Sequence, residues 1–318
     1  MGKLAVVLFN LGGPDRSEAV RPFLVNLFSD PAILSVPQPF RWLLARTIAF
    51  RRAPMAVEIY RQLGGGSPLL PNTRAQAAAL KAALGPDAEV FVAMRYWHPR
   101  SAETAAAVRS FAPAEIVLLP LYPQLSGTTT GSSLKDWRKS AALAGLTAPT
   151  HVVESYPIEP GFIAAMAALI RPAYEKAAAA GAPRLLFTAH GLPQRVVDRG
   201  DPYQKQVEAT AQAIVARLGI AGLDWQLSYQ SRVGPLEWLR PYTEDELLRA
   251  GRDRVPLVVA PIAFVSEHSE TLVELDITYR EEALKHGVPL YERVPTVGTH
   301  PEFIAGLARL VTAARAAR

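Results

Sequence analysis

His190 combines a side chain suited to proton transfer with a position at the edge of a predicted sheet. It follows the largely apolar run Leu185–Ala189, which has the length and composition of a buried strand, and Gly191 and Pro193 end that strand. In parallel α/β sheets, ligands bind outside the carboxyl ends of the strands. A histidine there can also cap its strand by bonding to a nearby carbonyl, so its position alone leaves both interpretations open.

A row of acidic residues further along the chain offers a partner for such a histidine. Glu267, Glu270 and Glu274 recur at spacings of three and four from the start of a predicted helix, which places three carboxylates on one helical face. The helix dipole favours acidic residues in a first turn, but Glu274 lies one turn further on. The row indicates a bound cation, a proton path or simply an exposed face. With His268 and no thiolate available, it suits a transiently held divalent ion or proton abstraction better than structural zinc.

The composition excludes several other classes of function. The 318 residues are 49% hydrophobic and 20% charged, as expected for two folded domains. The net charge is only +5 and the basic residues are scattered along the chain, which does not indicate nucleic-acid binding. The absence of cysteine excludes disulfides, thiolate catalysis and cysteine-held metal sites. No apolar stretch reaches the roughly 18 residues that span a bilayer, and no signal peptide precedes the first strand, so we expect a cytoplasmic protein.

Strands and helices alternate in the predicted pattern, which indicates two α/β domains, each a Rossmann-like parallel β-sheet flanked by helices. The boundary lies in the proline-containing segment 155–161 and gives domains over 1–157 and 158–318, with a helix over 301–317 that can pack back on the first domain. The cleft between two such domains is a usual ligand site. The expected strands are Leu4–Leu11, Glu89–Tyr96, Glu115–Leu121, Thr150–Glu154, 185–190, Trp225–Tyr229, Val255–Ile262 and Val288–Arg293.

Two glycine-rich loops raise the alternative of a nucleotide-dependent enzyme. The loop 12–14 follows the first strand, and the loop 64–68 ends a predicted helix. Neither loop has the G-x-G-x-x-G pattern or the Gly-Lys-Ser/Thr ending of a phosphate-binding loop, which argues against this alternative.

The segment 34–52 has the pattern of a basic amphipathic helix. Its apolar face is formed by Phe40, Leu43, Leu44, Thr47 and Ile48, with arginines around it. Such a helix suits a membrane interface or an apolar ligand with acidic groups. A surface helix that packs its apolar face on the core would show the same pattern, so both interpretations remain.

Eight motifs, in order and spread over both halves, together resemble the ferrochelatase family over nearly the whole chain. The motifs are Asn10–Pro14, Gly64–Pro68, Arg95-Tyr96 with His98-Pro99, Tyr122–Gln124 with Thr129–Ser133, Ala189–Pro193, Gly200–Tyr203, Gln230–Pro235, and Pro261–Phe264 with Ser266–Leu272.

This resemblance implies a chelatase fold with its active site in the cleft between the domains, and insertion of Fe²⁺, a substrate, into protoporphyrin IX with release of two protons. By position, His190 matches the essential histidine, which takes a pyrrole proton or passes metal to the ring, and Glu270 matches its carboxylate partner. Both would contact the metal. Glu267, His268 and Glu274 match a proton path or outer metal site. The positions that match porphyrin-binding residues are Leu11, Arg51, Arg52, Tyr60, Ser67, Arg95, Tyr96, Trp238 and Phe264.

The resemblance also implies partners. The segment 34–52 matches a lip that takes porphyrin from the membrane, which implies peripheral contact with the inner face of the membrane and hand-over from the preceding enzyme of haem synthesis. Some relatives carry a cysteine-bound [2Fe–2S] cluster, and because this chain has no cysteine and ends shortly after its last predicted helix, we expect no cofactor.

Two alternatives to a protoporphyrin ferrochelatase remain. One branch of the family acts on coproporphyrin III, although the two glycine-containing motifs near the N-terminus look more like the protoporphyrin branch. A non-catalytic tetrapyrrole carrier on the same fold is the other alternative, but a carrier has no need of a base opposite carboxylates. Thr278 also stands where some relatives continue the acidic row, so the outer proton route differs here.

Overall fold

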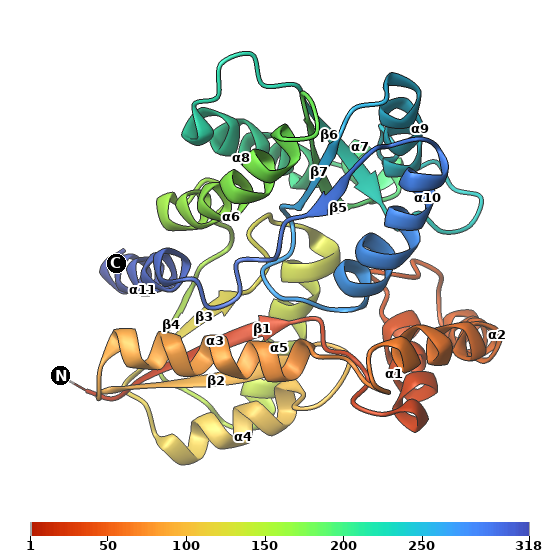
Figure 1. The fold of residues 1–318 in the computed structure, drawn as a ribbon. Helices are drawn as coiled ribbons and strands as arrows, with labels where there is room; N and C mark the ends of the chain where they lie inside the picture. Colours follow the sequence, from red (N-terminus) through yellow and green to blue (C-terminus); the bar gives the residue numbers. More distant parts are fainter. Residues whose placement is uncertain (1, 318) are drawn as a thin grey trace. The chain divides into compact units, whose positions relative to one another are not determined.

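Two four-stranded parallel sheets, each flanked by helices, make up the computed structural model, which describes residues 2–317 (Figure 1). The predicted α/β class with parallel sheets is therefore confirmed. The chain divides into two compact units, one formed by residues 2–155 with 307–317 and the other by residues 156–306. The break between Ser155 and Tyr156 lies in the segment where the sequence places a boundary.

The first unit has the strand order β2-β1-β3-β4. Its strands are β1 (Leu4–Asn10), β2 (Ala88–Met94), β3 (Glu115–Pro120) and β4 (Thr150–Val152). Its helices are η1 (Ser17–Ala19), α1 (Val20–Ser29), α2 (Phe40–Gln62), α3 (Leu69–Leu84), α4 (Ser101–Phe111), η2 (Gly127–Gly131) and α5 (Ser132–Leu143). The end of α11 (Pro301–Ala316) belongs to this unit, where Arg315 Nε lies 3.0 Å from Glu115 Oε2.

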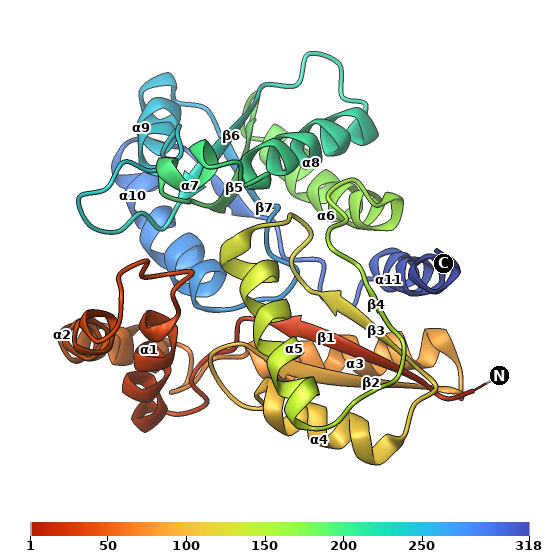
Figure 2. The same cartoon turned by 180° about the vertical axis from the view of Figure 1, so that it is seen from behind.

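The central strand β1 is buried on both faces, which explains why its sequence is a continuous apolar run rather than an alternating one. Successive side chains of a strand point to opposite faces. Ala5, Val7 and Phe9 share one face and pack in a core with Val108 of α4 and Trp137 of α5. Helix α3 covers the opposite face (Figures 1 and 2).

The second unit has the strand order β6-β5-β7-β8. Its strands are β5 (Arg184–His190), β6 (Trp225–Gln230), β7 (Leu257–Pro261) and β8 (Tyr291–Arg293). Its helices, besides the start of α11, are α6 (Pro160–Ala178), α7 (Gln194–Asp198), α8 (Tyr203–Leu218), α9 (Thr243–Asp253), η3 (Glu270–Tyr279) and α10 (Arg280–Lys285). Helices α6 and α8 cover one face of the sheet, and α9 and α10 cover the other (Figures 1 and 2).

The alternation of side chains along β5 determines where His190 points. Leu186 packs in a core with Leu275 and Tyr279 of η3. Residues 186, 188 and 190 share a face because the strand period is two. His190, the last residue of β5, is therefore directed toward the side of the sheet that η3 covers.

The structure corrects one predicted helix. The helix predicted over the lip segment continues through Pro54 to Gln62 as α2, as expected. The acidic segment does not begin as an α-helix, because Glu270–Tyr279 is a π-helix and α-helical geometry starts only at Arg280. Spacings of three and four residues cannot reveal this, because they fit an α-helix equally well. Among the described residues, no helix combines the length and apolar character required to cross a membrane.

Candidate active site

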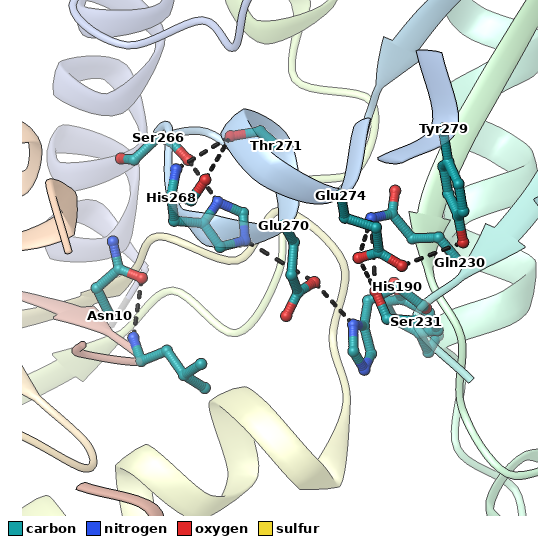
Figure 3. Close-up of polar contacts among 12 residues, drawn as sticks. Asn10, His190, Gln230, Ser231, Ser266, His268, Glu270, Thr271, Glu274 and Tyr279 are labelled. Atoms are coloured by element: carbon teal, nitrogen blue, oxygen red, sulfur yellow. Dashed lines mark hydrogen bonds and ion pairs between the residues drawn. The ribbon is translucent and has the colours of Figure 1, made fainter. Parts of the chain in front are cut away.

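His190 and Glu270 form the central contact of the second unit. Atom Nδ1 of His190 lies 2.9 Å from Oε2 of Glu270, as Figure 3 shows. His190 ends β5, and Glu270 is the first residue of the π-helix η3, so the contact joins two elements of the α/β framework. π-helical turns are rare and occur often at functional sites.

The two side chains of this pair stabilise each other's charged forms. Burial alone would raise the pKa of Glu270, but the charge and hydrogen bond of His190, with a smaller effect of His268, hold that pKa below its usual range. Burial alone would lower the pKa of His190, but Glu270 and, more weakly, Glu274 raise it above its usual value. An ionised carboxylate accepts only, so Nδ1 of His190 carries a hydrogen and donates it to Glu270. Atom Nε2 then remains available to accept a proton.

Glu274 lies one turn further along η3 and is held by three donors. Its Oε2 accepts hydrogen bonds from Gln230 Nε2 at 3.1 Å and Ser231 Oγ at 2.6 Å, and its Oε1 accepts from Tyr279 Oη at 3.1 Å (Figure 3). Burial and, to a smaller extent, the negative charge of Glu270 raise the pKa of Glu274. Among the acidic residues of the predicted row, Glu274 is therefore the one best suited to hold a proton.

Aromatic side chains lie against both histidines of the site. The ring centroid of Trp238 is 6.4 Å from that of His190, and the ring of Phe264 is 4.6 Å from that of His268. Atom Nε2 of His268 lies 3.8 Å from Oε2 of Glu270. The structure thus brings together all the predicted residues of the second unit except one.

Glu267 is the exception, and the prediction of three carboxylates on one helical face is wrong. Glu267 precedes η3, and its Oε1 accepts hydrogen bonds from Arg293 Nη1 at 2.6 Å and from the backbone N–H of Thr296 at 2.9 Å. These contacts, with the Arg293 charge, lower its pKa even though burial alone would raise it. Only Glu270 and Glu274 belong to the cluster around His190.

The donors around His190 do not form a closed metal site. Within residues 2–317, no group of three or more histidine, aspartate or glutamate side chains lies close enough together to hold a metal ion. An imidazole and a carboxylate are nevertheless ligands that divalent iron accepts. The pair suits brief contact with a metal better than permanent ligation.

In the first unit, the predicted ligand-facing residues lie after strands β1 and β2, in a glycine loop and on helix α2. Leu11 follows β1, and Tyr60 is buried near the end of α2; both belong to one apolar cluster. Ser67 N–H donates to the Pro14 carbonyl at 2.7 Å, which joins the two loops. A Cβ atom on Gly13 would lie 2.5 Å from Ser67 Oγ, so this close approach requires glycine.

Arg51 and Arg52 lie on α2, whose large apolar side chains are exposed rather than packed on the core. Arg51 is exposed, and the Arg52 guanidinium lies 5.9 Å from the ring centre of Phe28. The packed face of α2 consists of small residues such as Ala45 and Ala49, both fully buried. The exposed apolar residues of α2 are Phe40 (70%), Trp42 (51%), Leu43 (60%), Leu44 (39%), Phe50 (65%) and Met55 (58%). Packing of this face on the core is therefore excluded.

Arg95 and Tyr96 bind an aspartate that the sequence analysis missed. Oδ2 of Asp30 accepts hydrogen bonds from Arg95 Nη2 at 2.7 Å, from Tyr96 Oη at 2.9 Å and from Ser132 Oγ. Burial alone would raise the pKa of Asp30, but hydrogen bonds from Ser132 and the Ala32 backbone, with the Arg95 charge, lower it. Tyr96 is fully buried, and its contact with a ligand stays a prediction.

Four further polar residues of the second-unit site were not predicted. Gln230 and Ser231 follow the same rule as His190, because Gln230 ends β6, Ser231 follows it, and the sheet register pairs Gln230 with His190. The predicted end of strand β6 could therefore have identified both residues as candidates for the site. Tyr279 and Tyr203, whose hydroxyl donates to the His190 carbonyl at 2.9 Å, lie within helices and gave no such signal.

Comparison with known proteins identifies similar chains over nearly the whole length. A family model described as Ferrochelatase matches residues 3–315. The ferrochelatase of Caulobacter vibrioides is 55% identical over 314 residues, covering 97% of this chain and 89% of that protein. The ferrochelatase of Phenylobacterium zucineum is 56% identical over 311 residues, covering 96% of this chain and 90% of that protein.

One solved structure bears on the fold alone. SirB from Bacillus subtilis with Fe³⁺ superposes with a TM-score of 0.58 at 10% identity, covering 98% of this chain and 94% of that chain. The two-sheet architecture is thus shared with a protein of very different sequence.

The Asp30 network predicts a large loss of stability when its carboxylate is removed. Asp30→Ala leaves the largely buried Arg95 guanidinium without its principal partner, which costs about 3 kcal/mol in the free energy of unfolding. Urea unfolding followed by tryptophan fluorescence measures this loss. Glu58→Ala is the control, because it breaks an exposed ion pair with Arg61 and costs less than about 1 kcal/mol. Equal losses in the two variants would contradict the structural role of Asp30.

Proposed function

Because the chain belongs to the ferrochelatase family, we propose that it inserts Fe²⁺ into protoporphyrin IX and releases two protons. The observation that carries this proposal is the 2.9 Å contact between His190 and Glu270 at the carboxyl end of β5. A base, a carboxylate that orients it and a second carboxylate that can take up a proton are the groups that metal insertion requires.

His190 acts as the general base in this mechanism. Its Nδ1–H donates to ionised Glu270, which leaves the Nε2 lone pair free to accept a pyrrole proton. The imidazolium that forms is stabilised by the adjacent carboxylate, as in other histidine–carboxylate pairs. The same imidazole and carboxylate are acceptable ligands for Fe²⁺, so the entering metal meets the group that removes the proton.

Glu274 takes up a proton that His190 releases. Its raised pKa makes it a better proton acceptor than Glu270, whose pKa is lowered. Its three donors, Gln230, Ser231 and Tyr279, fix both carboxylate oxygens in place. Both carboxylates belong to η3, one turn apart, so a proton can pass from the base along one helix.

Trp238 and Phe264 provide apolar surface beside the two histidines for a flat ring. A ring held in plane directs its nitrogen lone pairs and N–H bonds away from an incoming ion. Binding that favours a bent ring would stabilise the metalation transition state more than the ground state. We assign the remaining porphyrin contacts to Leu11, Arg51, Arg52, Tyr60, Ser67 and Arg95.

The exposed apolar face of α2 takes porphyrin from the inner surface of a membrane, as part of peripheral contact by a cytoplasmic enzyme. Phe50 and Leu43 are each at least 60% exposed, and arginines lie beside them. Apolar residues with flanking arginines fit the interface of an anionic bilayer. Porphyrin handed over from a preceding enzyme of haem synthesis could enter by the same route.

Removing the base should slow insertion strongly but leave ring binding intact. In anaerobic assays with protoporphyrin IX and Fe²⁺, His190→Ala should lower kcat by about 10²–10⁴-fold, with little change in the porphyrin Kd measured by fluorescence quenching. His151→Ala, which disrupts a histidine–glutamate contact on β4, is the control and should retain wild-type activity.

Wild-type turnover by His190→Ala would contradict the role of the base. The same assay with coproporphyrin III separates the two branches of the family, since the proposal requires the higher kcat/KM for protoporphyrin IX. Porphyrin binding by the wild-type protein without any metal insertion would favour a carrier.

The pH dependence of insertion should change when Glu270 loses its charge. His190 must be neutral to accept a proton, so kcat/KM falls as pH decreases through its raised pKa. In Glu270→Gln the burial that lowers this pKa remains but the main raising charge is gone, so the acid limb moves to lower pH and the plateau falls. The control is Glu115→Gln, which removes a carboxylate on β3 and should leave the pH dependence unchanged. An acid limb that stays in place or moves to higher pH would contradict the pairing.

Charge on the apolar face of α2 should weaken membrane binding. The double variant Leu43→Glu and Phe50→Glu should reduce cosedimentation with anionic lipid vesicles at least about tenfold, because burying each of these side chains contributes about 1.5–3 kcal/mol. Leu143→Glu, at an 80% exposed position ending α5, is the matched control and should sediment like the wild type. Equal sedimentation of the double variant and the wild type would exclude this face as the membrane contact.

A further inference from the structure

Arg293 binds two carboxylates at once on the side of the sheet where η3 lies. Its Nε and Nη2 donate to Oδ1 and Oδ2 of Asp276 at 2.7 and 2.5 Å, which is a bidentate contact. Its Nη1 donates to Oε1 of Glu267 at 2.6 Å. The Arg293 side chain is only 10% exposed, so all three donors act where water screens them little.

The two bound carboxylates lie on either side of the pair proposed to move protons. Glu267 comes three residues before Glu270, and Asp276 comes two residues after Glu274. Strand β8 therefore holds the segment that carries Glu270 and Glu274 at both of its ends. The register of β8 with β7, in which Arg293 pairs with Val259, fixes the position of Arg293 relative to His190 on β5.

A second set of contacts from the same region holds the backbone of η3. Tyr291, also on β8, donates its hydroxyl hydrogen to the Leu275 carbonyl at 2.8 Å. Arg280 donates from Nε to the Asp276 carbonyl at 3.1 Å and from Nη1 to the Tyr291 carbonyl at 2.9 Å. An uncommon backbone conformation persists when its surroundings determine it, and here β8 supplies those surroundings.

Stability alone does not account for a buried arginine with two carboxylates. Removing three charges from water is costly, and apolar side chains of similar volume would often stabilise a fold as well or better. Orientation is a better explanation, because an arginine fork fixes both the distance and the direction of a carboxylate. A misplacement of about 1 Å at a reacting group can cost about 10²-fold in rate.

On the basis of the proposed function, we propose that Arg293 is a positioning residue, which sets the direction of the Glu270 and Glu274 carboxylates toward His190 by holding Glu267 and Asp276. Arg293 touches neither His190 nor Glu270 in this role. It acts through the π-helix, so its loss changes the rate of insertion more than it changes the binding of the porphyrin.

The chain contains a matched control for this inference. Arg184 begins β5, the strand that His190 ends, and it also binds two carboxylates, with Nε 2.8 Å from Asp224 and Nη1 2.9 Å from Asp253. Its side chain is 9% exposed, close to the value for Arg293. Both arginines are largely buried and bind two carboxylates, but Asp224 and Asp253 lie outside the segment that carries Glu270 and Glu274.

The first measurement compares kcat and porphyrin Kd in Arg293→Gln and Arg184→Gln, per folded protein and with thermal stability recorded. We expect Arg293→Gln to lose about 10²-fold in kcat with an unchanged porphyrin Kd, and Arg184→Gln to lose less than about twofold. Arg293→Lys should remain slow, because an ammonium cannot replace the bidentate fork. If Arg293→Gln is too unstable to purify, Asp276→Asn removes one arm of the contact and should give an intermediate loss in kcat.

The second measurement does not depend on activity. Hydrogen exchange of the amides in residues 267–280 should be faster in Arg293→Gln than in the wild type and unchanged in Arg184→Gln. Unchanged exchange there, or a loss of kcat no larger than that of Arg184→Gln, would overturn the inference. A wild-type protein that inserts no metal would instead contradict the proposed function, and hydrogen exchange would still decide whether Arg293 holds η3.

Discussion

The hydrogen bond between His190 and Glu270 is the interaction on which the proposed chemistry depends. A histidine at the end of a buried strand would ordinarily lose affinity for protons, since burial disfavours its charged form. Glu270 reverses this effect and also determines which ring nitrogen remains open. In the proposed mechanism the pair is therefore a base with a defined direction, and β5 and η3 present its two members.

The framework meets this requirement through the regular geometry of one sheet and one irregular helix. Strand β5 presents His190 by simple alternation, and β6 places Gln230 beside it in register. The carboxylates come from the π-helix η3, which is held by neighbouring side chains rather than by a favourable local sequence. In the proposed mechanism, the strands supply the base and an externally held helix supplies the proton acceptors.

The sequence predicts the sheet and the position of His190 well because both follow from short-range patterns. Apolar runs of strand length and the glycine and proline residues after them locate β5 and His190. The π-helix could not be predicted, because Glu267, Glu270 and Glu274 fit α-helical spacing and only long-range contacts from β8 show that Glu267 turns toward Arg293. Asp30 was missed for a similar reason, since its partners Arg95 and Ser132 are far from it in sequence.

The most direct test of the account is whether His190 and Glu270 act as one unit in catalysis. A double-mutant cycle measures this from kcat for anaerobic insertion of Fe²⁺ into protoporphyrin IX by the wild type, His190→Ala, Glu270→Gln and the double variant. The account predicts that the double variant is no slower than His190→Ala, because Glu270 acts through the histidine. Losses that multiply in the double variant would show that the two residues act independently, which would contradict the central claim.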